Sequence, residues 1–252
     1  MPMHLKLMTQ SISSQNSFNI EPIGFIHSPY AEKFAVPRQP GLAPDALSVI
    51  EFYPPYNDEL SFIGIDGFSH IHVIFLFDRV EYTSFRPKVR PPRLGGNTSV
   101  GVFATRSPFR PNRLGLSIVK LNRVIRENGK VKLEVKGADL VDGTPVIDIK
   151  PYIPFVDSVP DAKGGFAKEK PKALEVIYQD NLDDYIESFV GPKRLEAITQ
   201  TLSQDPRPAY KDNEHDTKIY SAKLYNLEIK FTVNLNVVTV IAVNCISGEL
   251  SC

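Results

Sequence analysis

Short apolar runs follow one another through the first 157 residues of this chain, and no helix-length periodic segment lies between them. Several runs alternate apolar with polar residues, as strands with one buried face do. Parallel strands need long crossovers that are usually helical, so this arrangement predicts a mainly β fold, a barrel of six or seven strands, instead of a doubly wound nucleotide-binding sheet. No Gly-x-Gly-x-x-Gly follows a strand anywhere. The predicted strands are Asn19 to His27, Leu47 to Phe52, Phe68 to Phe77, Val100 to Thr105, Gly115 to Ile125, Lys130 to Lys136 and Val146 to Tyr152.

Turn chemistry and composition divide the chain. Asn128-Gly129 lies between two alternating runs, and Asn-Gly is a preferred pair for a two-residue hairpin because both residues tolerate positive φ. The stretch 158–171 is polar, rich in Gly and Lys, and aperiodic. We therefore predict a barrel domain over 18–157, a linker over 158–171 and a smaller domain over 172–252.

The smaller domain is predicted to be α+β. Asn181 can cap a helix whose first turn holds Asp183 and Asp184, where the helix dipole favours anions. A second helix is expected to begin at Pro192 and to end before Asp205. A closing hairpin is expected from the strands Ile219 to Val233 and Val237 to Val243, turned at Asn234 to Asn236.

Composition indicates a globular protein. The chain has 252 residues, 42% of them hydrophobic, which is enough for a full core. Its two cysteines, Cys245 and Cys252, form no zinc-ribbon or disulfide-framework spacing. No stretch approaches the roughly 18 uncharged residues of a membrane span, and residues 1–17 hold no continuous apolar core of a signal peptide. We expect a cytoplasmic protein with a mobile tail over 1–17.

Basic residues are concentrated in one stretch, although the chain has a net charge of zero. Between Glu81 and Glu127 lie forty-five residues with ten Lys or Arg and no Asp or Glu. Such segregation favours a basic surface that binds a polyanion. The alternative is that these side chains form a solvated face or pair with carboxylates from other segments.

Two histidines on one predicted strand form a candidate site. His70 and His72 are expected to share a strand face with Asp78, because side chains alternate across a strand. Two imidazoles and a carboxylate can hold a metal ion. However, Asp78 lies about six residues, roughly 20 Å, beyond His72 in an extended chain. The pattern favours a central barrel strand with polar ends facing a pocket, and a metal site is the alternative.

Two proline-rich loops are candidates for ligand contact. Three prolines around Arg38 and Gln39 restrict the loop 26–42, which suits a ligand-facing loop, although an ordinary surface loop also uses Pro. The segment DPRPAY, Asp205 to Tyr210, presents a carboxylate, a guanidinium and a phenol on a stiffened backbone. It is either a rigid cap on the preceding helix or part of a site.

Five ordered segments together resemble one family. They are SPYAEKFAVPRQPGL, FSHIHVIFLFD, VRPPRLGGNTSVGVFATRSPFRPNRLGLS, DLVDGTPVIDIKPYIPF and DPRPAY. In this order they are similar to the TsaA-like (YaeB-like) tRNA methyltransferases, over roughly Ile20 to Val233. The resemblance implies a homodimeric barrel enzyme that uses S-adenosylmethionine without a Rossmann glycine fingerprint. It also implies the substrate, N6 of threonylcarbamoyladenosine beside the anticodon, in tRNAs that include a threonine tRNA.

The resemblance further implies a cofactor pocket. We expect backbone groups around Asp142 and Gly143 to read the adenine edge, and Leu114 to cover its face. We expect Arg106 to meet the methionyl carboxylate through a bidentate contact. The implied positions are Pro37, Arg38, Gln39, Pro40, Asp78, Arg79, Arg106, Leu114, Leu140, Val141, Asp142, Gly143 and Thr144.

Methyl transfer also needs a base for the N6 proton. The candidates are Tyr210 and Asp205, in the segment that also holds Arg207, with His70 behind them. Phe109 or Tyr210 could stack on the splayed base. The arginines expected to contact tRNA phosphates or the threonyl carboxylate are Arg90, Arg93, Arg110 and Arg113.

Three positions depart from the family pattern. His72 stands where relatives often have Trp, Asp78 where some have His, and Arg113 where many have Pro. Asp78 can change how the cofactor's sugar is held, and Arg113 adds a cation beside the pocket. Two rival functions follow from the residues alone. A non-catalytic RNA-binding barrel would bind no cofactor, and a metal-dependent hydrolase built on His70 and His72 would lose activity with a chelator.

Overall fold

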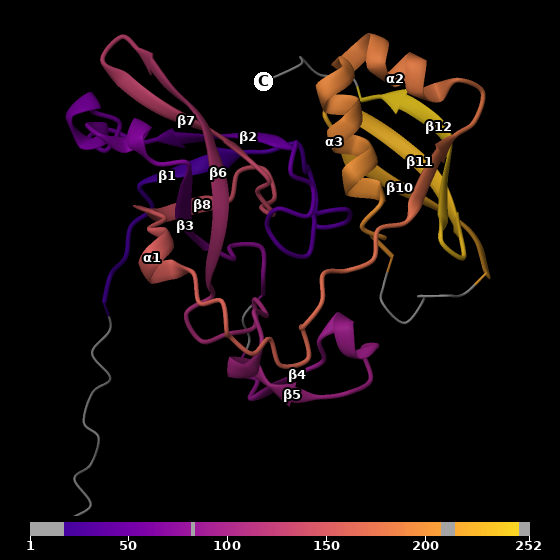
Figure 1. The fold of residues 1–252 in the computed structure, drawn as a ribbon, viewed down its shortest axis with the longest axis horizontal. Coiled ribbons are helices and arrows are strands. Elements are labelled where there is room, and N and C mark those ends of the chain that lie inside the picture. The colour runs from indigo at the N-terminus through magenta and orange to yellow at the C-terminus, as the bar shows by residue number, and fades with distance from the viewer. Residues whose placement is uncertain (1–17, 82–83, 208–214, 247–252) are drawn as a thin grey trace, which may run out of the picture.

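The computed structural model describes residues 18–81, 84–207 and 215–246, with the backbone alone for 215–217. Figure 1 shows a β-barrel beside a second sheet that two helices cover on one face. The mainly β fold expected from the sequence is confirmed. The predicted tail 1–17 lies outside the described residues. In the described part of the chain, no helix is long and apolar enough to cross a membrane.

Six antiparallel strands close the barrel in the order β1-β2-β7-β6-β3-β8. Closure leaves no free strand edge, which explains how strands as short as four residues persist in it. Alternate residues point inward; on β7 these are Val131, Leu133 and Val135, each at most 1% exposed. The strands are β1 (Gly24–His27), β2 (Leu47–Phe52), β3 (His70–Leu76), β6 (Leu114–Glu127), β7 (Lys130–Lys136) and β8 (Pro145–Pro151).

The predicted hairpin at Asn128-Gly129 is confirmed. Asn128 has φ 53° and Gly129 has φ 72°, the positive angles of a tight turn matched to strand twist. After β8, a short helix α1 (Pro154–Asp157) follows, and residues 158–174 then hold neither helix nor strand.

One predicted strand, Val100 to Thr105, was wrong. Its first two residues form β5 (Val100–Gly101), which pairs only with β4 (Lys88–Val89) outside the barrel. The next residues form a 3-10 turn over Val102–Ala104. Both the backbone N–H and the side-chain hydroxyl of Thr105 donate to the Val102 carbonyl, at 3.1 and 2.7 Å, and this closes the turn. The short 3-10 helices elsewhere are Glu59–Phe62, Ile65–Gly67 and Pro92–Leu94.

The second sheet has the order β10-β11-β12-β9, and its helices are α2 and α3. The predicted strand Ile219 to Val233 was wrong, because Tyr225 and Asn226 adopt φ 50° and 61° and turn the chain into two strands there. The strand β9, parallel to β12, was not predicted. The elements are β9 (Glu175–Tyr178), α2 (Leu182–Val190), α3 (Pro192–Leu202), β10 (His215–Leu224), β11 (Leu227–Asn234) and β12 (Val237–Cys245).

The helix after Asn181 begins where expected, but the expected side-chain cap is absent. Asn181 itself has φ 57°, in the left-handed region, and its side chain accepts no hydrogen bond from the first turn of α2. An Asn cap needs extended backbone to reach those N–H groups. The second helix begins at Pro192 and ends at Leu202, as predicted.

Two hydrophobic cores form, and one loop belongs to the second of them. The barrel core contains Ile26, Ile71 and Leu133 among other buried residues. The segment 30–46 leaves the barrel and contributes Tyr30 and Ala43 to the core beneath α2 and α3. The two parts of the chain therefore pack through a shared segment, which positions the loop around residue 38 between them.

Candidate active site

A cavity of about 560 Å³ lies beside β3 and β6. Its volume is within the range of small-molecule sites. Segments far apart in the sequence form its wall. The lining residues lie within 37–39, 74–77, 105–110 and 114–117, and at Asp139.

A glycine shapes the apolar side of this cavity. Gly115 pairs with Phe75 across β3 and β6. A Cβ at Gly115 would sit 2.2 Å from the Phe75 ring, so only glycine lets the ring lie there. Phe75 packs edge-on against Phe77, with centroids 5.0 Å apart. Leu114 and Leu116 extend this apolar wall.

Three arginines, Arg38, Arg106 and Arg110, line the polar side. Arg106 Nη1 donates to Gln39 Oε1 at 2.8 Å, and Arg110 Nη1 donates to the Thr105 carbonyl at 3.2 Å. A guanidinium has five N–H donors, so each of these keeps donors for an anion. The cavity therefore combines an apolar wall with fixed positive charge.

Asp139 is the one carboxylate among the described residues that line the cavity. Ser117 Oγ donates to its Oδ1 at 2.5 Å. Burial raises the pKa of Asp139 to about 6, although the Ser117 hydrogen bond acts in the opposite direction. The group therefore titrates much closer to neutral pH than an exposed aspartate.

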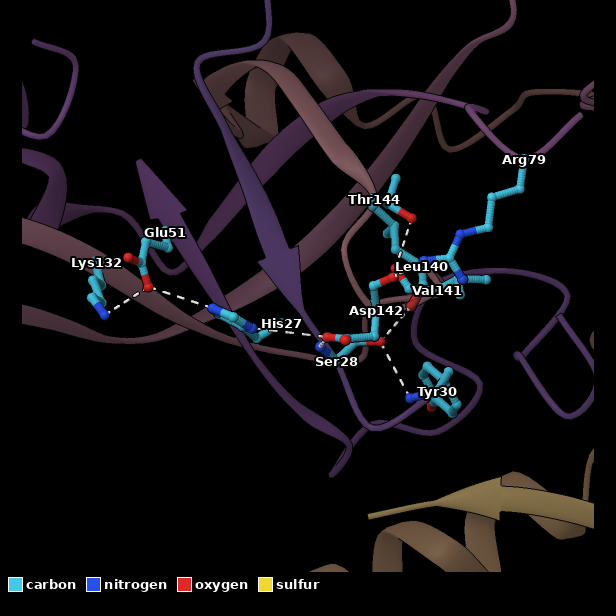
Figure 2. Close-up of polar contacts among 10 residues, drawn as sticks. All are labelled: His27, Ser28, Tyr30, Glu51, Arg79, Lys132, Leu140, Val141, Asp142 and Thr144. Carbon is cyan, nitrogen blue, oxygen red and sulfur yellow. Dashed lines mark hydrogen bonds and ion pairs between the residues drawn. The ribbon is translucent and has the colours of Figure 1, made fainter. Parts of the chain in front are cut away.

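The turn at Asp142 is held by the loop that follows β1 (Figure 2). The Asp142 N–H donates to the Tyr30 carbonyl and the Gly143 N–H to the Ile26 carbonyl, both at 2.8 Å. The N–H of Ser28 donates to Asp142 Oδ1 at 2.9 Å. The backbone N–H groups of Asp142 and Gly143, which belong to the groups expected to read the adenine edge, are thus engaged within the chain.

Arg79 packs over the same turn. Its Nη2 donates to the Asp142 carbonyl, and Lys33 Nζ donates to the Arg79 carbonyl at 2.9 Å. Gly143 has φ 77°, which favours glycine, and its missing Cβ would lie 3.4 Å from Arg79 Nη2. Thr144 closes the turn, with its N–H and hydroxyl both bonded to the Val141 carbonyl.

Figure 2 shows a row of charged residues that leads away from the Asp142 side chain, through His27 and Glu51 to Lys132. His27 lies between two carboxylates, 3.4 Å from Glu51 and 3.9 Å from Asp142. Lys132 Nζ donates to Glu51 at 2.7 Å, and chiefly this bond lowers the pKa of Glu51. His27 therefore approaches the same Asp142 oxygen, Oδ1, that accepts the hydrogen bond from the Ser28 N–H.

The DPR segment makes a structural contact. Arg207 is 1% exposed, and its Nε and Nη2 donate to the two carboxylate oxygens of Asp205 at 2.8 and 2.7 Å. Arg38 Nη2 donates to the Arg207 carbonyl at 2.7 Å. Both Asp205 oxygens are held by a buried guanidinium, which does not favour Asp205 or Arg207 in proton transfer. The other expected base, Tyr210, lies outside the described residues.

The two histidines of β3 contact separate partners. His72 Nε2 lies 3.1 Å from Asp157 Oδ2, and His70 Nδ1 lies 2.9 Å from the Ser69 hydroxyl. Asp78 lies beyond the end of β3 and 3.9 Å from Arg79. Within the described ranges, no group of three or more His, Cys, Asp or Glu is placed to hold a metal ion.

The basic stretch separates into two populations. Arg123 pairs with Glu134 at 3.0 Å and Arg126 with Asp66 at 2.5 Å, as the ion-pair alternative expected. Arg90 and Arg93 are exposed, by contrast, and pair with no carboxylate in the described part of the chain. Arg90 directly follows β4, and Arg93 lies in the 3-10 helix Pro92–Leu94.

Two other side chains expected to contact the tRNA, those of Arg113 and Phe109, already have partners within the chain. Arg113 Nη1 donates to the Val80 carbonyl at 3.4 Å. Arg86 lies over the Phe109 ring, 5.1 Å from its centroid. The aromatic pair Phe85 and Phe103 is accessible to solvent instead, with 47% and 72% of the two residues exposed. Their centroids lie 6.4 Å apart.

The structure brings together only some of the expected cofactor residues. Pro37, Arg38, Gln39, Arg106 and Leu114 line one cavity. Arg79 and the turn 140–144 form the adjoining network, whereas Pro40 and Asp78 do not line the cavity. Sequence reasoning missed Ser117 and Asp139. A signal existed for Asp139, which stands alone among apolar neighbours immediately before the turn.

Two family models, several named relatives and solved structures match this chain over most of its length. Residues 25–158 match the model described as tRNA-methyltransferase O N-terminal domain, and residues 171–246 match the TrmO C-terminal domain. A protein of Escherichia coli (strain K12) named tRNA (adenine(37)-N6)-methyltransferase is 44% identical over 221 residues, covering 86% of this chain and 94% of the relative. A protein of the same name from Eikenella corrodens is 49% identical over 182 residues, covering 72% and 100%. The crystal structure of TrmO from Pseudomonas aeruginosa superposes with a TM-score of 0.74 at 33% identity, covering 92% and 100%.

Proposed function

The chain belongs to the tRNA-methyltransferase O family, and from this membership we propose that the cavity beside β3 and β6 is its active site. The protein is an S-adenosylmethionine-dependent tRNA methyltransferase that acts on N6 of the adenine at position 37. The observation that supports the location is the convergence of three arginines and one carboxylate on an apolar-walled cavity of about 560 Å³.

The residues of the cavity suit the cofactor. S-adenosylmethionine supplies a methyl group on a positively charged sulfur. Leu114 and Phe77 offer an apolar surface for its adenine. Arg106 binds the methionyl carboxylate, and Gln39 fixes the direction of that guanidinium through the 2.8 Å hydrogen bond. Arg79 and the turn 140–144 support this region from the side.

The proposed substrate is threonylcarbamoyladenosine in the anticodon loop of a threonine tRNA. Arg110 lines the cavity and can bind the threonyl carboxylate, because an arginine pairs well with a planar anion. Arg90 and Arg93 are exposed and contact the phosphates of the loop. Phe85 and Phe103 offer ring faces to neighbouring unstacked bases.

We also propose a cytoplasmic homodimer, with a barrel domain over 18–157, a linker over 158–171 and a smaller domain over 172–252. Phe155, Val156 and Val159 support the dimer, since they are 89%, 60% and 59% exposed in the single chain. Apolar side chains gathered on a surface mark protein interfaces. Sedimentation of the wild type and of Phe155→Glu tests this: the variant should sediment as a monomer, and an unchanged dimer would contradict it.

Transfer of a labelled methyl group tests the function. Purified protein is incubated with methyl-labelled S-adenosylmethionine and tRNA that carries unmethylated threonylcarbamoyladenosine. Digestion and nucleoside mass spectrometry should place the label on N6 of that nucleoside. Label on unmodified adenosine would overturn the proposed substrate. Salt-sensitive tRNA binding with no label would support a non-catalytic RNA-binding barrel instead.

A further inference from the structure

We propose that Asp139 is the general base that removes the N6 proton of the substrate adenine, an inference that rests on the proposed active site. Asp139 follows β7 and directly precedes the turn at residue 142. Of the described residues that line the cavity, it is the one carboxylate. Of the bases expected from the sequence, Asp205 is held by Arg207 through both oxygens.

The contacts of Asp139 suit a proton acceptor held in place. Ser117, on the neighbouring strand β6, is 2% exposed and donates to Asp139 Oδ1 at 2.5 Å. This bond fixes the orientation of the carboxylate and leaves other acceptor sites available, because a carboxylate can accept about four hydrogen bonds. The substrate amine can therefore donate to the same group from the open side of the cavity.

Charged and titratable groups face Asp139 from several elements. Burial is the largest influence and raises its pKa to about 6, while the hydrogen bonds from Ser117 and from its own backbone, and the charge of Arg106, act against burial. Arg38 and Arg110 line the same cavity, and Tyr30 interacts with Asp139 electrostatically from the loop after β1. A base whose pKa lies near the working pH is mostly deprotonated and still has a useful affinity for the proton.

The reaction needs such a base because the N6 lone pair is delocalised into the purine and the carbamoyl group. As N6 bonds to the methyl carbon, the carbon–sulfur electron pair stays on sulfur, which becomes a neutral thioether. The N6–H bond breaks, its electron pair stays on nitrogen, and the proton passes to Asp139. Asp139 then releases the proton to water before the next turnover.

Two variants test the assignment, Asp139→Asn and Ser117→Ala, with the exposed Asp161→Asn as control. In single-turnover reactions at saturating cofactor and tRNA, Asp139→Asn should lower the rate by about 10²- to 10⁴-fold. Its affinity for S-adenosylmethionine, measured by calorimetry, should stay within about threefold of the wild type. Asp161→Asn should match the wild type in both measurements.

The pH profile separates a base from a merely structural aspartate. The wild-type rate should rise with pH through a midpoint near the Asp139 pKa of about 6. Ser117→Ala should move this midpoint upward, because it removes a hydrogen bond to the charged form. A readout independent of activity is ¹³C NMR of labelled aspartate carboxyls, in which the resonance missing from Asp139→Asn should titrate near the same pH.

Each contrary result has a distinct meaning. A rate for Asp139→Asn within about threefold of the wild type would overturn Asp139 as the base. A cofactor affinity that falls as much as the rate would make Asp139 a cofactor-binding residue and would equally overturn the inference. No transfer by the wild type would overturn the proposed function itself, whatever the variant does.

Discussion

Arg38 Nη2 donates a 2.7 Å hydrogen bond to the backbone carbonyl of Arg207, and this bond joins the cavity wall to the segment that follows α3. Arg207 is itself fixed by Asp205 through a bidentate ion pair. The DPR segment therefore sets the position of a cavity arginine from outside the cavity. Its residues act on the site by positioning Arg38.

The Asp205–Arg207 pair should contribute strongly to stability. Asp205→Ala removes two hydrogen bonds between the fully buried Arg207 guanidinium and the Asp205 carboxylate, so the free energy of unfolding should fall by about 3–5 kcal/mol. Urea denaturation measures this. The control is Arg123→Ala, which removes a pair whose Arg side chain is 64% exposed and should change stability by less than about 1 kcal/mol. Equal changes in the two variants would contradict the structural assignment.

Asp139 should make stability depend on pH. Its folded-state pKa of about 6 lies above its ordinary value of 3.8, so the folded protein binds the proton more tightly than the unfolded chain. The stabilisation from this proton is present below about pH 4 and is lost as pH rises through about 6. The total loss in the free energy of unfolding is up to about 3 kcal/mol. The unfolding free energy of Asp139→Asn, measured from pH 4 to 7, should lack this loss. Parallel curves for the two proteins would contradict it.

Gly115 should be required for the shape of the cavity. In Gly115→Ala the new methyl meets the Phe75 ring at 2.2 Å, so the ring, which lines the cavity, or the strand must shift. We expect a loss of about 1–3 kcal/mol in stability, as for other overpacked sites, together with weaker cofactor binding. Gly67→Ala is the control, because its Cβ would meet nothing within 4 Å and its φ is not positive. Thermal melts and calorimetry measure both effects.

Arg90 and Arg93 should govern the salt dependence of tRNA binding. Replacing either with Ala should weaken binding and reduce the slope of log affinity against log salt by about 1, because each neutralises one phosphate. Arg126→Ala is the matched control. Arg126 lies on β6 and pairs with Asp66, and the β6–β7 hairpin lies at the top of the view in Figure 1, whereas β4 lies at the bottom. A slope equal to that of the control would remove these two arginines from the tRNA surface.

Local patterns predicted much of the fold. A short apolar run placed Leu47–Phe52, strict alternation placed Lys130–Lys136, and the Asn-Gly pair placed the hairpin at Asn128, all at their observed positions. Two predicted strands were wrong because each contains a turn at residues other than glycine or proline. Tyr225-Asn226 breaks a strand through two positive φ angles, and Val102 closes a turn inside an apolar run.

The site was less predictable than the fold. The resemblance supplied Arg38, Arg106 and Leu114, which share one cavity in the structure. Ser117 and Asp139 were missed because their pairing joins β6 to the end of β7, and a hydrogen bond across 22 residues leaves no local pattern. The sequence made Asp205 a candidate base. Its ion pair with the buried Arg207 side chain is seen only in the three-dimensional structure.

Cofactor binding to a protein with a filled cavity tests the central claim most directly. Leu114→Trp places a larger ring in the apolar wall, whereas Leu60→Trp enlarges a side chain that is 75% exposed elsewhere on the barrel. By calorimetry, the wild type and Leu60→Trp should bind S-adenosylmethionine with equal affinity, and Leu114→Trp should lose at least about tenfold, or 1.4 kcal/mol. Undiminished binding by Leu114→Trp, with its fold intact by circular dichroism, would show that the cofactor occupies a different site.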